Sequence, residues 1–124
     1  MEFVETPIFT KMIQALLKDE DYQKLQQELA NKPEAGKLIR GSGGLRKYRW
    51  AGTGTGKRGG LRIIYFWHVA RNIILMLYAY PKAKKENLTF ELMKKLNYMI
   101  HLLEENKDEK TQNVTEELVL YMFL

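Results

Sequence analysis

The sequence predicts a single α+β domain, in which a small antiparallel sheet packs with an N-terminal helical hairpin and a C-terminal helix. Three observations predict this class. Apolar residues recur at helical spacing in the first third of the chain, three runs rich in β-branched and aromatic residues fill the middle, and helical spacing returns after residue 88. The predicted order of elements is β-α-α-β-β-β-α, for which one antiparallel sheet packed against helices is the simplest architecture.

The N-terminal third is predicted to form a short strand over residues 2–6 and then two helices. Thr6 suits a helix N-cap and Pro7 suits the first helical position. The acids of "KDED" favour the start of the second helix, which Pro33 and Gly36 end. The apolar stripes of the two helices are Ile8, Met12, Ile13 and Leu16, and then Tyr22, Leu25 and Leu29.

Three strands and a last helix are predicted in the rest of the chain. The strands are "GLRKYRWA", "LRIIYFWH" and "IILMLYAY", and the turn "VARN" joins the last two. The second and third strands are almost continuously apolar, so both of their faces should be at least partly covered. In "LTFELMKKLNYMIHLLEEN", helical spacing relates Leu92, Leu96, Ile100 and Leu103.

Charge is distributed unevenly along the 124 residues, whose net charge is +5. The window from Ala35 to Lys85 holds twelve Lys or Arg and no Asp or Glu, so all 15 acids lie in the flanks. This pattern indicates a polyanionic partner such as nucleic acid, although basic residues can also serve only to solvate a surface. With no cysteine, no signal peptide and no membrane-spanning run, a cytoplasmic protein is expected.

The stretch "GTGTGK" looks like a phosphate-binding loop, but its spacing is wrong for a Walker motif. Gly52 and Gly56 are one residue too close, Arg58 follows Lys57 where a hydroxyl is required, and a strand rather than a helix comes next. A glycine-rich hairpin connection is the better interpretation. Lys57 and Arg58 would add positive charge to it, or the loop is only a connector.

A cationic site is predicted on one face of the sheet. Alternation along "LRKYRWA" places Tyr48 and Trp50 toward the core and makes Lys47 and Arg49 project together from the open face. Arg62 opens the next strand and would lie close to them in a simple hairpin. The end of the last strand adds further lysines, namely Lys82, Lys84 and Lys85.

Such a cluster contains the parts needed to cleave RNA. Arginine presents a fixed fork of donors to phosphate oxygens, and a lysine crowded by other cations gives up its proton more readily and can act as a base. Cations stabilise the charge that develops on phosphate in the transition state. No metal or other cofactor is expected, because no carboxylate lies in the basic window. His68 and His101 leave a two-histidine ribonuclease arrangement open, whereas Ser42 does not lie in a nucleophile elbow.

Two stretches, "GSGGLRKYRWAGTGTGKRGGLRIIYFW" and "LYAYPKAKKENLT", closely resemble the HigB branch of the RelE-like toxins of bacterial toxin–antitoxin pairs. The resemblance covers about residues 3–105. It implies a RelE-like fold and a ribosome-dependent endoribonuclease that cuts messenger RNA in the ribosomal A site without a metal. It also implies three partners: the ribosome, messenger RNA and a cognate, HigA-like helix-turn-helix antitoxin.

The resemblance also implies roles for individual residues. Lys47 and Arg49 match the two basic residues of the family's second strand, which contact and activate RNA, and Arg62 matches the arginine that stabilises the scissile phosphate. We therefore predict Lys47, Arg49 and Arg62 as catalytic. The predicted RNA-binding residues are Arg46, Lys57, Arg58, Lys82, Lys84 and Lys85. The loop after the last strand lacks the family's arginine and tyrosine, so no general acid is assigned.

The predicted domain organisation is a RelE/HigB-like toxin domain over residues 1–106 and a tail of unknown role over 107–124. Two alternatives to a nuclease stay open. One is a non-catalytic RNA- or ribosome-binding module of the same fold, which would inhibit translation without cleavage. The other is a subunit whose acidic helices and apolar tail matter mainly for binding a partner protein.

Overall fold

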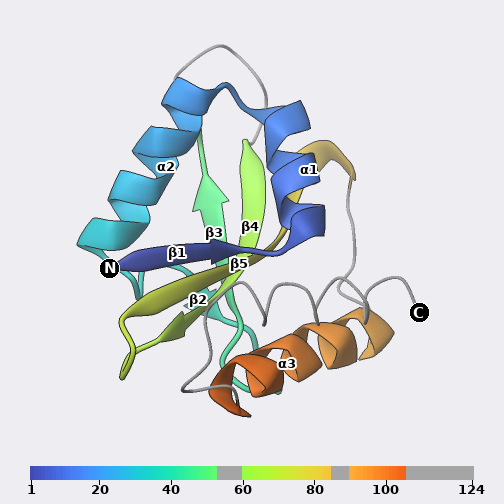
Figure 1. The fold of residues 1–124 in the computed structure, drawn as a ribbon. Coiled ribbons are helices and arrows are strands. Elements are labelled where there is room, and N and C mark those ends of the chain that lie inside the picture. Colours follow the sequence, from blue (N-terminus) through green and yellow to red (C-terminus); the bar gives the residue numbers. More distant parts are fainter. Residues whose placement is uncertain (53–59, 85–89, 106–124) are drawn as a thin grey trace.

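The computed structural model describes residues 1–52, 60–84 and 90–105 and has an α+β architecture (Figure 1). The predicted helical hairpin, sheet and C-terminal helix are all present in the predicted order, so the fold class is confirmed. A two-residue strand and a single 3₁₀ turn were not predicted. The elements are β1 (Glu2–Glu5), α1 (Pro7–Leu16), α2 (Asp19–Asn31), β2 (Lys37–Leu38), β3 (Arg46–Trp50), β4 (Leu61–His68), β5 (Ile73–Pro81), the turn η1 (Lys82–Lys84) and α3 (Phe90–Glu105).

The strands form one sheet in the order β1-β5-β4-β3-β2. Neighbouring strands run antiparallel except β1, which pairs with β5 in parallel. A parallel pair needs a long connection, and here the helical hairpin and three strands separate the two partners in sequence. Helices α1 and α2 pack on one face of the sheet and α3 packs on the other (Figure 1).

Thr6 starts α1 and fastens it to the sheet. Its hydroxyl accepts a hydrogen bond from the Phe9 backbone N–H at 3.1 Å, as an N-cap does, and donates to the Leu77 carbonyl at 3.1 Å. Pro7 follows as the first helical residue, where the missing N–H costs nothing. The predicted start of this helix is confirmed, and it is tied directly to β5.

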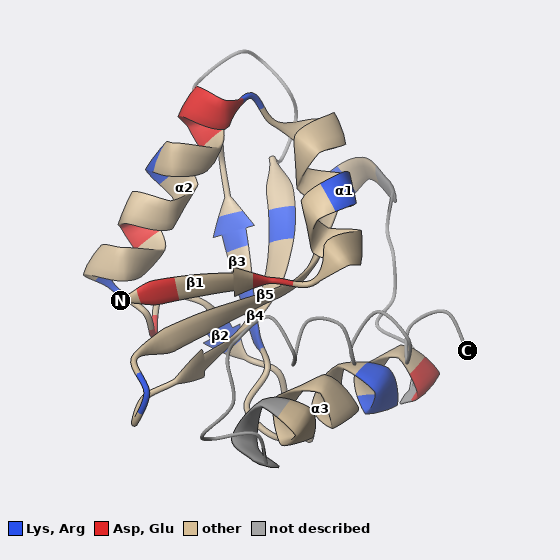
Figure 2. Ribbon diagram, viewed as in Figure 1, with Lys and Arg blue, Asp and Glu red and all other residues tan. Residues whose placement is uncertain are grey.

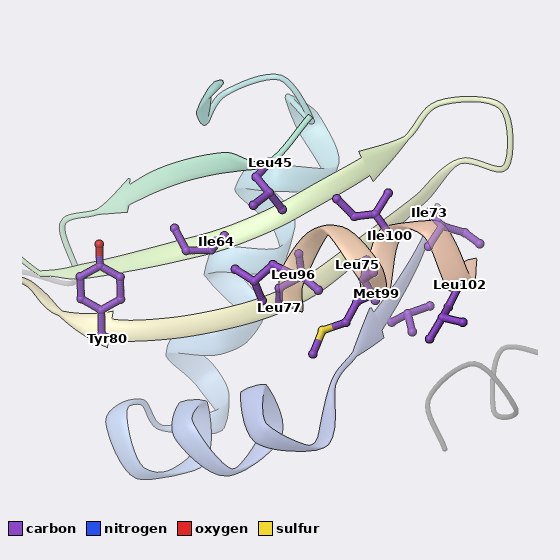
Figure 3. Close-up of a cluster of buried hydrophobic side chains, with 11 residues drawn as sticks. Leu45, Ile64, Ile73, Leu75, Leu77, Tyr80, Leu96, Met99, Ile100 and Leu102 are labelled. Carbon is purple, nitrogen blue, oxygen red and sulfur yellow. The ribbon is translucent and has the colours of Figure 1, made fainter. Parts of the chain in front are cut away.

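Two apolar cores lie on the two faces of the sheet. Along β4, Ile63 and Tyr65 enter the core beneath α1 and α2, whereas Ile64 enters the core beneath α3. This division confirms that the apolar strands are covered on both faces. Figure 3 shows the second core, in which side chains of α3 meet those of β4 and β5. Its members include Leu45, Ile64, Leu75, Leu77, Tyr80, Leu96, Met99 and Ile100.

The predicted division of the chain into residues 1–106 and a tail over 107–124 stays a prediction, because the tail lies outside the described residues. Within the part of the chain that the structure describes, no helix combines the length and the apolar character that a membrane span requires.

Candidate nucleic-acid interface

Three predicted site residues share one face of the sheet. Arg49 of β3 lies directly opposite Arg62 of β4, and Lys47 lies two residues from Arg49 along the strand. Directly opposed residues project from the same face, and so do residues two apart on one strand. Figure 2 shows basic segments of β3 and β4 side by side. The structure thus brings together Lys47, Arg49 and Arg62, which we call the cationic cluster; their catalytic roles remain predictions.

A glycine fixes the strand register that pairs the two arginines. Gly60 precedes β4 with a positive φ of 61°, and a Cβ built on it would come within 1.9 Å of the Trp50 carbonyl oxygen. Only glycine combines this conformation with so close a backbone approach. Trp50 pairs with Leu61 as a result, and the next pair along the ladder is Arg49 with Arg62.

The members of the cluster differ in exposure. Lys47 and Arg49 are exposed, as predicted for the open face, but Arg62 is only 8% exposed. On the ladder, Arg62 lies between Arg49 on one side and Tyr80 of β5 on the other. Its Nη1 donates a long hydrogen bond to the Leu61 carbonyl at 3.4 Å. Arg62 is therefore held in place, while its two exposed neighbours can adjust to a ligand.

The opposite face of β3 is anchored to α2. The Glu28 carboxylate accepts hydrogen bonds from the Tyr48 hydroxyl and, at 3.1 Å, from Trp50 Nε1. Burial, and then the hydrogen bond to Glu28, raise the pKa of Tyr48 to about 12, so this phenol stays a donor at neutral pH. Trp50 is 4% exposed, which confirms the predicted core-facing side of the strand. The anchor orients β3 so that its alternate residues, Lys47 and Arg49, face outward.

The strands around the cluster are basic. Strands β2, β3, β4 and β5 contain no Asp or Glu. Among the described residues, no group of three or more His, Asp or Glu side chains is arranged to hold a metal ion. The donors that this face offers are guanidinium and ammonium groups, which suit phosphate oxygens.

No protein-family model matches the sequence. Among solved structures, the chain is similar to the free E. coli toxin RelE carrying two arginine-to-alanine substitutions, with a TM-score of 0.50, 15% identity, and 68% of this chain and 85% of that chain covered. The chain has the RelE fold. The intact E. coli RelBE toxin–antitoxin complex also matches, with a TM-score of 0.47, 18% identity, and 63% and 92% coverage. Assignment to the HigB branch remains a prediction.

Arg46 is not brought into the cationic cluster. It lies on the opposite face of β3, with Tyr48 and Trp50, and its Nη1 donates to the backbone carbonyls of Glu34 at 3.1 Å and Gly36 at 2.8 Å. These bonds tie the segment before β2 to the sheet. RNA binding by Arg46 stays a prediction, and this placement does not favour it.

The remaining predicted RNA-binding residues follow β3 or β5. Lys82 is exposed, and its backbone N–H donates to the Gly60 carbonyl at 3.2 Å, which places it at the end of the sheet where β4 begins, near Arg62. Lys84 is the last residue of η1. Three others, Lys57, Arg58 and Lys85, lie outside the described residues.

The two histidines and the single serine are not members of the cationic cluster. His68 ends β4, six residues from Arg62, a separation of about 20 Å along a strand. Its Nδ1 accepts a hydrogen bond from the Arg71 backbone N–H at 3.2 Å. His101 is an exposed residue of α3. Ser42 is buried and caps the turn before β3, where its hydroxyl accepts from the Leu45 N–H at 3.0 Å.

Sequence reasoning missed one cation on this face. Lys37 of β2 is directly opposite Lys47 of β3, so both side chains project from the face of the cationic cluster. A strand of two residues has no periodicity to detect. The only sequence signal was the position of Lys37 inside the window that contains no acid.

Proposed function

We propose that this protein is the toxin of a type II toxin–antitoxin pair, in the HigB branch, and that it cuts messenger RNA in the ribosomal A site without a metal. The observation that carries the proposal is the pairing of Arg49 with Arg62 beside Lys47 on a face rich in cations. The RelE fold and the resemblance of the basic strand sequences support it.

In the proposed reaction, a base takes the proton of a ribose 2′-OH and the 2′-oxygen attacks the adjacent phosphorus. The bond to the 5′-oxygen breaks, leaving a 2′,3′-cyclic phosphate, and an acid protonates the departing 5′-oxygen. Lys47 is the proposed base, because it is exposed and lies on the same face of the sheet as Arg49 and Arg62. Arg49 and Arg62 would hold the phosphate oxygens as their negative charge grows.

The two arginines suit different parts of this task. Arg62 is nearly buried between Arg49 and Tyr80, so its guanidinium offers a preorganised contact to the scissile phosphate. Arg49 is exposed and can follow the phosphate as the geometry changes. Lys82, near the start of β4, is proposed to bind a phosphate.

The proposed partners follow from the same resemblance. They are the ribosome, its messenger RNA and a HigA-like helix-turn-helix antitoxin that neutralises the toxin, and the proposed site of action is the cytoplasm. A neutralising antitoxin would have to cover the cationic cluster or prevent entry into the A site. An antitoxin with acidic residues at its contact would complement the charge of this face.

The test is controlled expression of the chain in bacteria, with mapping of messenger 5′ ends. Wild-type protein should arrest growth and produce new ends in phase with codons. Arg49→Ala is the cleaner inactivating variant, because Arg49 is exposed whereas Arg62 is packed in the sheet. Arg62→Lys keeps the charge and removes the fork of donors. Lys24→Ala, an exposed residue of α2 on the other side of the sheet, is the matched control.

A second candidate function is a non-catalytic module that binds RNA or the ribosome and blocks translation. The feature that favours it is the sequence "PKAKKENL" after the last strand, which carries neither the arginine nor the tyrosine that the family often has there. Growth arrest without codon-phased ends would favour this function over the nuclease. Absence of both effects would reject each RNA-directed proposal.

A further inference from the structure

Two like-charged pairs lie next to each other on the same face of the sheet. Lys37 is opposite Lys47 across β2 and β3, and Arg49 is opposite Arg62 across β3 and β4. Like charges directly opposite each other on neighbouring strands destabilise a sheet. The repeated arrangement extends the cationic cluster to the sheet edge, where it ends at Lys37.

The cations at this edge make no direct polar contact with the described residues. The side chains of Lys37, Lys47 and Arg49 form no hydrogen bond or ion pair within the ranges 1–52, 60–84 and 90–105. All three are exposed. A ligand with several negative charges would remove the repulsion within both pairs at once, which a single carboxylate could not do.

The geometry of the sheet separates the two ends of this row. Lys37 and Arg62 are two strands apart laterally and two residues apart along the strands, so their Cα atoms lie about 12 Å apart. Arg62 is nearly buried and remains close to its own strand. A phosphate held by Arg62 is therefore beyond the Lys37 ammonium unless both side chains extend toward each other. Lys37 is therefore better placed to contact a different phosphate of the same RNA chain.

We propose that Lys37 binds the RNA phosphate adjacent to the one held by Arg49 and Arg62, and that Lys47 lies between the two phosphates. The inference rests on the proposed function for the identity of the polyanion. It adds a binding residue on β2 and gives the RNA a direction across the sheet, from β4 toward the β2 edge. Contact with a flanking phosphate contributes binding energy that is the same before and during bond cleavage.

Lysine on an edge strand has another explanation that the test must separate. Edge lysines protect a sheet from pairing with other chains, and Lys37 lies in the last strand of the sheet. A lysine that serves only this purpose affects aggregation and leaves the salt dependence of RNA binding unchanged.

The experiment measures binding of full-length protein to a short, fluorescein-labelled 2′-O-methyl uridine homopolymer, which cannot be cleaved through the 2′ position. The dissociation constant is measured at salt concentrations from about 50 to about 200 mM. The slope is taken as the magnitude of the decrease of the logarithm of the association constant with the logarithm of the salt concentration. Each lost phosphate contact should lower this slope by about 0.7 for single-stranded RNA. The variants are Lys37→Gln, Lys37→Arg, Lys47→Gln and, as a control of equal charge change, Lys24→Gln.

The inference predicts a lower slope for Lys37→Gln and the wild-type slope for Lys37→Arg and Lys24→Gln, with circular dichroism confirming that each variant is folded. A wild-type slope in Lys37→Gln overturns it, with or without aggregation. In that case a lower slope in Lys47→Gln together with codon-phased cutting would leave the proposed nuclease standing. A lower slope in Lys37→Gln without any cutting by wild-type protein would support the binding role and reject the nuclease. A wild-type protein that does not bind the probe overturns the inference.

Discussion

On the face that α1 and α2 cover, the polar side chains of β3 find partners, whereas on the other face the cations of the same strand lie opposite further cations. Tyr48 and Trp50 both donate to Glu28, yet Lys47 lies opposite Lys37 of β2 and Arg49 lies opposite Arg62 of β4. The period of two in a strand separates these roles within five residues. On the face covered by α1 and α2, Tyr48 and Trp50 of β3 are hydrogen-bonded to α2, whereas on the face where α3 packs β3 carries exposed charges that weaken the sheet.

The largest expected effect tests the face covered by α1 and α2. Trp50→Ala should lower the free energy of unfolding by about 3–5 kcal/mol, because the indole is 4% exposed and its removal leaves a cavity. Denaturant unfolding monitored by circular dichroism measures this loss. The neighbouring variant Arg49→Ala is the control and should change stability by no more than about 0.5 kcal/mol. Equal stabilities of the two variants would contradict the assignment of faces.

The next effect tests the cationic face. Arg49→Ala should reduce the rate of messenger cleavage on ribosomes by about 100-fold, a typical loss for one group that stabilises transition-state charge. The measurement is a cleavage time course with saturating toxin, followed by primer extension. Lys24→Ala, with the same loss of charge on α2, should cut at the wild-type rate. If both variants lose activity equally, only the overall positive charge matters and the cluster has no specific role.

These two faces could be assigned from the sequence because basic and aromatic residues alternate over residues 47–50 of β3. The helix start at Thr6 and Pro7 and the full extent of β4 were equally predictable, since local residue chemistry determines them. The parallel pairing of β1 with β5 was not, because it depends on contacts between segments more than 65 residues apart.

The candidate site was only partly predictable for a related reason. Alternation along β3 placed Lys47 and Arg49 together, but the burial of Arg62 depends on its neighbours on both adjacent strands. Arg46 was predicted to bind RNA from its charge alone, whereas its guanidinium bonds to the Glu34 and Gly36 carbonyls on the other face. Lys37 was missed because tertiary pairing alone makes its two-residue strand.

A third prediction concerns Glu28, which anchors β3 to α2. Glu28→Ala removes the acceptor of both the Tyr48 hydroxyl and Trp50 Nε1, and should destabilise the protein by about 1–3 kcal/mol. The loss of unfolding free energy should be smaller than in Trp50→Ala. Comparing the two variants therefore tests whether packing of the indole contributes more to stability than its hydrogen bond. Gln27→Ala, an exposed neighbour on the same helix, should stay close to wild-type stability in the same unfolding assay.

The smallest expected effect is a dependence of stability on alkaline pH. The folded state raises the pKa of Tyr48 from 10.0 to about 12, first through burial and then through Glu28. Because the folded state keeps the phenol neutral at pH values where the unfolded chain would ionise it, this contribution to stability is complete below about pH 10 and is lost as the pH rises toward 12. Burial also raises the pKa values of Tyr22 and Tyr65, so wild-type stability should fall in the same window.

Tyr48→Phe should reduce that fall, measured as the difference in unfolding midpoint between pH 9 and pH 11. Tyr98→Phe, at a residue 42% exposed on α3, is the control, and an unchanged fall in Tyr48→Phe would show that the Glu28 anchor does not hold the phenol in solution.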